Sequence, residues 1–123
     1  MPSMGMQEWI AAGRAIAQGH LTRHGREARF TNAFEHRLAE MTGARHALAV
    51  SSGTAALISA LVGAGIGPGD EVLVPAYTWM ATAAAVVIVG AVPIFVDIDE
   101  TLTIDPHDIE RKITPYTRAI MPV

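Results

Sequence analysis

The sequence has no cysteine, a single lysine and no excess of basic residues, and the first and last of these shortages each exclude a class of protein. Its 123 residues include no Cys, so disulfide frameworks and cysteine-ligated zinc sites are excluded. Nine Lys and Arg residues against twelve Asp and Glu residues give a formal net charge of −3. Acidic and basic residues are interspersed, so no basic stripe is available for nucleic acid. We therefore expect no nucleic-acid partner.

Charged residues are also scarce, at 17%, whereas half of the residues are hydrophobic and the mean hydropathy is +0.30. Such a composition suits one piece of a larger α/β domain, whose strands are covered on both faces. From Val72 to Val96 there is no charge, a length that could span a bilayer. Pro75, Gly90 and Pro93 interrupt this stretch, which favours strand, loop, helix and strand over a membrane span. With no signal peptide evident at the N-terminus, we expect a cytoplasmic protein with no membrane partner.

Hydrophobic spacing and turn residues predict alternating helices and strands. Thr31 or Asn32 is expected to cap the second helix and Gly43 to end it, while Asp105 and Pro106 are expected to open the last. A loop is expected at 20–31. The expected helices are 7–18, 33–41, 53–64, 80–89 and 106–112, and the expected strands are 46–50, 71–75, 92–96 and 117–123.

This order predicts an α/β fold with right-handed crossovers, in which an open, mostly parallel sheet has helices on both faces. Residues 1–32 are expected to form an N-terminal helix and loop. Residues 33–123 are expected to be the first part of a larger domain, because the last strand is followed by no helix to cover it.

The stretch from Ala47 to Ala56 combines a short apolar run, a turn of two serines, Gly53 and Thr54, and the start of a helix. A helix N-terminus offers unpaired N–H groups and a positive dipole end, which together suit a phosphate. Gly53 lets an anion approach the backbone, and Thr54 adds a hydroxyl donor. The alternative interpretation is an ordinary strand-to-helix turn. The pattern is neither a Walker loop nor a dinucleotide fingerprint.

Trp79 is the second candidate, because it follows the strand expected at 71–75. In open α/β sheets, ligands bind at the carboxyl edge of the strands, where the turn at Gly53 is also expected. The indole could stack on an aromatic ring whose phosphate is held at Gly53 and Thr54. A tryptophan packed in the core or at a subunit contact is the alternative.

Asp97 and Asp99 follow the strand expected at 92–96 and support a rival function. The pattern Asp-x-Asp-x-Thr resembles the first motif of haloacid dehalogenase-like phosphatases, in which the first Asp accepts the phosphoryl group and Mg²⁺ assists. That motif normally opens its domain, whereas three strands are expected before it here. Lys112 is expected to be solvated, and the pair His20 and His24 is not expected to bind metal.

Five segments in order resemble the DegT/DnrJ/EryC1/StrS aminotransferases, which are fold-type I pyridoxal-phosphate enzymes. The segments are FEHRLAEMTG at 34–43, AVSSGTAAL at 49–57, GIGPGDEVLVPAYTW at 65–79, GAVPIFVDID at 90–99 and ITPYTRAIMPV at 113–123. The resemblance implies the first part of the large domain of a fold-type I aminotransferase. It implies pyridoxal 5'-phosphate as cofactor, with Gly53 and Thr54 at its phosphate and Trp79 on its ring.

The same resemblance implies a homodimer that transfers an amino group from an amino donor to a keto-sugar, often nucleotide-linked. The family's Schiff-base lysine and the Asp partner of the pyridine nitrogen match no position among these 123 residues. We therefore expect a part that binds the cofactor phosphate, holds no catalytic or metal-binding residue, and is inactive alone. Two alternatives stay open, the phosphatase that uses Asp97 and Asp99 and a non-catalytic fragment or regulator.

Overall fold

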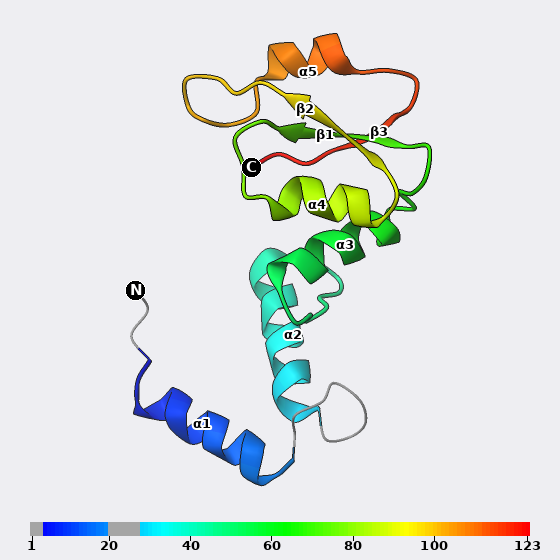
Figure 1. Ribbon diagram of the computed structural model, residues 1–123. Coiled ribbons are helices and arrows are strands. Elements are labelled where there is room, and N and C mark those ends of the chain that lie inside the picture. Colours follow the sequence, from blue (N-terminus) through cyan, green and yellow to red (C-terminus); the bar gives the residue numbers. More distant parts are fainter. Residues whose placement is uncertain (1–3, 20–27) are drawn as a thin grey trace. The chain divides into compact units, whose positions relative to one another are not determined.

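The computed structural model describes residues 4–19 and 28–123, which form two compact units (Figure 1). The first unit ends at Ala49 and the second begins at Val50. Residues 20–27, which hold most of the expected loop together with His20 and His24, lie outside the described residues. Each unit is considered by itself.

The first unit contains helices α1 (Met6–Ala17) and α2 (Arg29–Thr42). The expected helix at 7–18 is confirmed to within one residue, and its start is stabilised by the Gly5 N–H, which donates to the Glu8 carboxylate at 2.8 Å. The expected start of α2 is wrong, because Thr31 and Asn32 lie inside the helix. Ala28, only 2% exposed, precedes the helix without a side-chain cap, so burial of this residue outweighs the polar capping signals.

The expected end of α2 is confirmed, but the expected strand at 46–50 is wrong. Gly43 adopts φ 70°, the left-handed conformation that commonly ends a helix. Residues 46–50 belong to no strand. A strand needs a neighbour to exchange hydrogen bonds with its backbone, and here the Ala49 N–H donates instead to the Glu35 carboxylate at 2.8 Å.

The second unit is built on a parallel sheet of three strands, β1 (Glu71–Pro75), β2 (Val92–Val96) and β3 (Thr117–Ile120). The spatial order is β2-β1-β3, and Leu73 of β1 pairs with Ile94 on one side and Ile120 on the other. The expected strands at 71–75 and 92–96 are confirmed. The expected strand at 117–123 is confirmed in position but ends at Ile120.

Helices cover both faces of this sheet, as the sequence predicts. Figure 1 shows α4 (Ala81–Ile88) on one face, with α3 (Gly53–Gly63) packed against it, and α5 (Pro106–Lys112) on the other. Alternate β1 residues therefore enter different cores: Val72 and Val74 pack toward α3 and α4, whereas Leu73 packs with Val96 and Ile104.

The uncharged stretch at 72–96 is divided among β1, α4 and β2, so the membrane-span alternative is wrong for it. No helix in the described part of the chain is long and apolar enough to cross a membrane. The last helix also follows its sequence signals, since the Asp105 side chain accepts from the His107 N–H at 2.9 Å and Pro106 occupies the first turn.

Candidate cofactor-binding site

The N-terminus of α3 presents two backbone N–H groups that have no partner in the described residues. Ser52 is the N-cap: its Oγ accepts from the Ala55 N–H at 3.1 Å, and its carbonyl oxygen accepts from the Ala56 N–H at 3.0 Å. The N–H groups of Gly53 and Thr54 lie between these bonds and stay available. An anion can therefore bind to them without breaking any bond of the helix.

Gly53 is required neither by the backbone conformation nor by packing within the protein. Its φ is not positive, and a Cβ built on it would meet no atom within 4 Å. The space beside the Gly53 Cα is therefore open. A glycine at this position has a clear physical use when another molecule approaches the backbone closely.

Trp79 lies beyond the carboxyl end of β1, between the Pro75 strand end and the first turn of α4. The residue is 80% exposed, which is unusual for so large an apolar group. It borders an open pocket of about 500 Å³ together with Gly53 and Thr54, and Thr82 of α4 contributes to the same lining. The structure thus brings the three sequence-predicted residues to one pocket at the carboxyl edge of the sheet.

Asp97 and Asp99 lie in the loop after β2 and are engaged in local hydrogen bonds. One oxygen of Asp99 accepts from the Thr101 N–H at 2.8 Å and from the Thr101 hydroxyl at 2.5 Å, and these bonds lower the pKa of Asp99. The Asp97 carboxylate accepts from the Ile98 N–H at 2.8 Å. Within residues 4–19 and 28–123, no group of three or more His, Asp or Glu residues could hold a metal ion.

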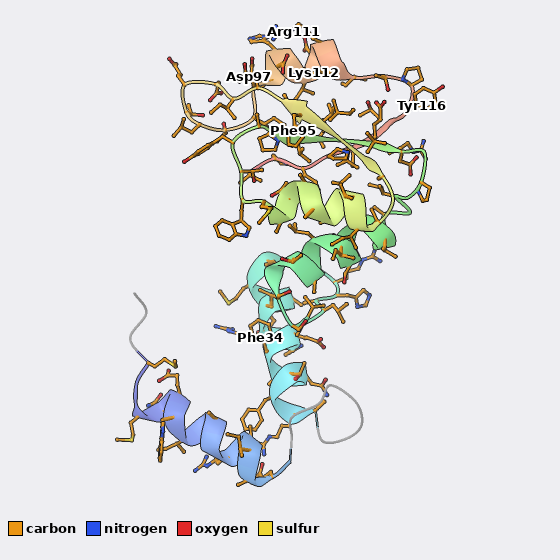
Figure 2. All side chains as sticks on the ribbon, viewed as in Figure 1. Phe34, Phe95, Asp97, Arg111, Lys112 and Tyr116 are labelled. Carbon is orange, nitrogen blue, oxygen red and sulfur yellow. The ribbon has the colours of Figure 1, made fainter. Side chains whose placement is uncertain are left out.

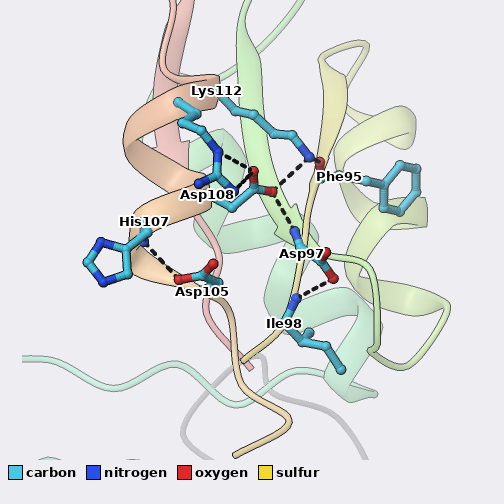
Figure 3. A network of polar contacts seen from close by, with 8 residues as sticks. Phe95, Asp97, Ile98, Asp105, His107, Asp108 and Lys112 are labelled. Carbon is cyan, nitrogen blue, oxygen red and sulfur yellow. Dashed lines mark hydrogen bonds and ion pairs between the residues drawn. The ribbon is translucent and has the colours of Figure 1, made fainter. Parts of the chain in front are cut away.

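Asp108 of α5 is the buried carboxylate that sequence reasoning missed (Figure 3). It is 5% exposed and accepts from the Asp97 N–H at 2.7 Å, from Lys112 at 2.8 Å and from Arg111 at 2.9 Å. The Asp97 N–H and the lysine ammonium together lower its pKa from 3.8 to about 2. The i, i+3 and i, i+4 spacing of Asp108 with the two cations was the available sequence signal.

Lys112 is only in part the solvated residue that the sequence predicts, because it also holds two polar partners. Its Nζ donates to the Phe95 carbonyl oxygen at 2.8 Å as well as to Asp108, and its side chain is 39% exposed. Figure 2 shows Lys112 and Arg111 on α5 and Phe95 on the neighbouring β2. The only lysine of the sequence is therefore committed to joining α5 to the sheet, and it does not line the pocket at Trp79.

Comparison with protein families shows which family the chain belongs to. The sequence model of the DegT/DnrJ/EryC1/StrS aminotransferase family matches residues 4–123, so the chain belongs to this family. This confirms the resemblance on which the sequence-based interpretation depends.

Solved structures of similar proteins agree with this assignment. A 3-amino-5-hydroxybenzoic acid synthase is 42% identical with a TM-score of 0.89, over 98% of this chain and 31% of its own. NtdA of Bacillus subtilis, described with bound cofactor PMP, is 39% identical with a TM-score of 0.84, over 93% of this chain and 26% of its own. An E. coli GDP-4-keto-6-deoxy-D-mannose-3-dehydratase with bound hydrated PLP is 26% identical with a TM-score of 0.85, over 99% of this chain and 32% of its own.

The chain spans about a third or less of the length of each of these relatives. The described sheet and helices correspond to one part of their α/β fold, as the resemblance implies. Pyridoxal 5'-phosphate or its amino form is bound by two of the three, so the cofactor predicted from the sequence is one that this family uses.

Proposed function

We propose that this chain is the part of a pyridoxal-phosphate-dependent sugar aminotransferase that binds the cofactor phosphate. The observation that carries the proposal is the single pocket bordered by Gly53, Thr54 and Trp79. Membership of an aminotransferase family supports the reaction class. Similarity to a putative sugar aminotransferase and to a GDP-4-keto-6-deoxy-D-mannose-3-dehydratase supports a keto-sugar or nucleotide-linked sugar as acceptor of the group from an amino donor.

The phosphate is held at the start of α3 in this proposal. The free N–H groups of Gly53 and Thr54 donate to its oxygens, the Thr54 hydroxyl adds a third donor, and the helix dipole favours the negative charge. Ser52 caps the helix, because its Oγ accepts from the Ala55 N–H. Its role is to keep the first turn of α3 in the conformation that presents the two N–H groups.

Trp79 supplies a flat surface for the cofactor ring. The residue is 80% exposed beside the pocket, so stacking of its indole on an aromatic ring buries apolar area of both partners. When bound, pyridoxal phosphate supplies the electron sink for exchange of an amino group. The chain's own contribution is to fix the phosphate and the ring plane and to exclude water from one face of the ring.

These 123 residues are not expected to catalyse the reaction by themselves. Lys112, their only lysine, is held by Asp108 and by the Phe95 carbonyl group and has no place in the pocket. We infer that the amine needed for cofactor attachment comes from elsewhere in the complete protein. The cytoplasmic location and the homodimer predicted from the sequence belong to the same proposal.

Titration of the complete protein with pyridoxal phosphate tests the site. With Phe in place of Trp9 and of any tryptophan outside residues 1–123, cofactor binding should quench the fluorescence of Trp79. Gly53→Ala places a methyl group where the phosphate approaches, and Thr54→Val removes a donor. Each should weaken binding by about tenfold, the equivalent of one lost hydrogen bond to a charged group.

The matched control is Gly63→Ala at the other end of α3, where a Cβ also meets no atom within 4 Å. It should leave the affinity unchanged. Equal affinities for all variants would contradict the proposed site. Mg²⁺-dependent hydrolysis of a phosphomonoester that Asp97→Asn abolishes would favour the phosphatase instead.

A further inference from the structure

Thr82 is a buried polar residue in a helix that is otherwise made of alanine and aliphatic residues. It is 4% exposed and lies in the first turn of α4, whose sequence is ATAAAVVI. Burial of a hydroxyl group is unfavourable unless the group is hydrogen-bonded. The partner is Thr78, whose Oγ1 lies 2.9 Å from the Thr82 Oγ1.

Thr82 makes hydrogen bonds to Trp79 and to the residue before it. The hydroxyl pair fixes residue 78, and the Thr82 N–H donates to the Trp79 carbonyl oxygen at 3.0 Å. The hydroxyl is not needed to cap the helix, because the N-cap position is Met80 and no side chain caps this end. The bond from Thr82 therefore acts on the loop before α4.

The exposed indole of Trp79 has few packing contacts that could hold it. With 80% of the residue accessible, the ring direction depends mainly on the backbone at 78–80. Aromatic rings attract each other only within a narrow range of distances and angles, so a ring that is already in position binds a second ring more tightly. Thr82 restrains this same backbone segment, so it also restrains the direction of the Trp79 indole.

We propose that Thr82, through its hydroxyl pair with Thr78, is a positioning residue that holds Trp79 in the orientation needed to stack on the cofactor ring. Thr82 borders the same pocket as Trp79, Gly53 and Thr54. The cofactor part of this inference rests on the proposed function, whereas the restraint on the indole does not. The two parts can therefore be tested separately.

The first measurement uses the complete protein without cofactor, with Phe in place of Trp9 and of any tryptophan outside residues 1–123. Time-resolved fluorescence anisotropy then reports the motion of the Trp79 indole. Thr82→Val keeps the shape of the side chain and removes the hydroxyl, and Thr78→Val removes the other member of the pair. Both should lower the residual anisotropy of Trp79, whereas Thr82→Ser should restore it to the unsubstituted level.

The second measurement uses the protein loaded with pyridoxal phosphate and follows the circular dichroism of the cofactor band. Thr82→Val and Thr78→Val should reduce its intensity and weaken binding by about five- to tenfold. Thr42→Val is the matched control, because the Thr42 hydroxyl also bonds four residues back in a helix, to the Leu38 carbonyl oxygen at 2.8 Å. It should change neither readout.

A Thr82→Val protein that melts earlier but keeps the anisotropy and the cofactor band would overturn the proposal, since Thr82 would then be only structural. If Thr82→Val does not fold, Thr78→Val, which changes a half-buried residue in an exposed loop, decides the question by the same readouts. Failure of the unsubstituted protein to bind pyridoxal phosphate would overturn the proposed function. The anisotropy measurement would still decide whether Thr82 restrains Trp79.

Discussion

The Nζ atom of Lys112 lies 2.8 Å from the carbonyl oxygen of Phe95, on the side of β2 that faces away from β1. The orientation follows from the neighbouring bonds: the Val92 N–H donates to Asp70, and the Val96 carbonyl accepts from Ala76. Residues 92 and 96 therefore point their backbone groups toward β1. Because successive residues of a strand alternate, Phe95 points its groups to the free edge.

Two more positions on this edge offer no free N–H group. Asp97, immediately after the strand, donates its N–H to the buried Asp108 carboxylate, and Pro93 has no N–H to offer. An edge strand with few free backbone groups is a poor template for pairing with another chain. We conclude that α5 protects this edge of the three described strands.

Lys112→Met should destabilise the second unit by about 1 kcal/mol, because it leaves the Phe95 carbonyl without its donor. The substitution keeps the aliphatic part of the side chain, so packing is little changed. Faster amide exchange along β2 and thioflavin-positive aggregation at high protein concentration would accompany the loss. The control is Arg111→Met, which also removes a cation from Asp108 but has no bond to β2. Similar aggregation of both variants would argue that charge, not edge protection, is responsible.

Asp108→Asn should destabilise the protein in a pH-dependent way. The pKa of Asp108 in the folded state is about 2, below its usual 3.8, so its ionised form stabilises the fold above pH 4. This contribution disappears as the pH falls through 4 toward 2. Urea unfolding should thus show a constant difference between the two proteins above about pH 5 and a shrinking one below pH 4. A difference independent of pH down to 2 would contradict the assignment.

Ser52→Ala should cost about 1 kcal/mol of stability, because the Ala55 N–H loses its acceptor at the start of α3. Hydrogen exchange at the first turn of α3 should accelerate, and affinity for pyridoxal phosphate should fall less than in Thr54→Val. Ser59→Ala, in the exposed interior of the same helix, tests whether loss of any serine hydroxyl suffices. It should be neutral or slightly stabilising.

Gly90→Ala should lower the free energy of unfolding by about 1–2 kcal/mol. Gly90 has φ 81°, which L-residues rarely adopt, and its new Cβ would lie 3.0 Å from Cγ of Pro68. The residue joins α4 to β2, so the strain acts directly on the sheet. Thermal unfolding measures the effect, and unchanged melting of the variant would show that this turn can relax.

The strands at 71–75 and 92–96 could be predicted because short β-branched runs are bounded by Pro and Gly. The stretch at 46–50 has a similar apolar pattern, yet it forms no strand. The local sequence indicates which residues could enter a sheet, but a strand also needs a neighbouring strand to pair with. No strand pairs with this stretch in the described part of the chain. The prediction of where α2 starts was wrong for a related reason, since the burial of Ala28 depends on tertiary packing.

The pocket could be predicted in part. Gly53 and Thr54 belong to a local turn pattern, and Trp79 follows a strand, so the rule for the carboxyl edge of a sheet brings them together. Thr82 carries no such signal, because one threonine in an alanine-rich helix looks like any other. Its role depends on a loop that brings Thr78 to 2.9 Å, which only the three-dimensional structure reveals.

The first strand of the sheet in sequence, β1, is also its central strand. During synthesis on the ribosome, residues 71–96 can therefore emerge and close a strand–helix–strand unit before β3 is made. β3 then adds to the opposite side of β1, with its register already set by a formed template. We expect nascent chains arrested after α4 and β2 to resist proteolysis in this segment, and those arrested before β2 to be cleaved.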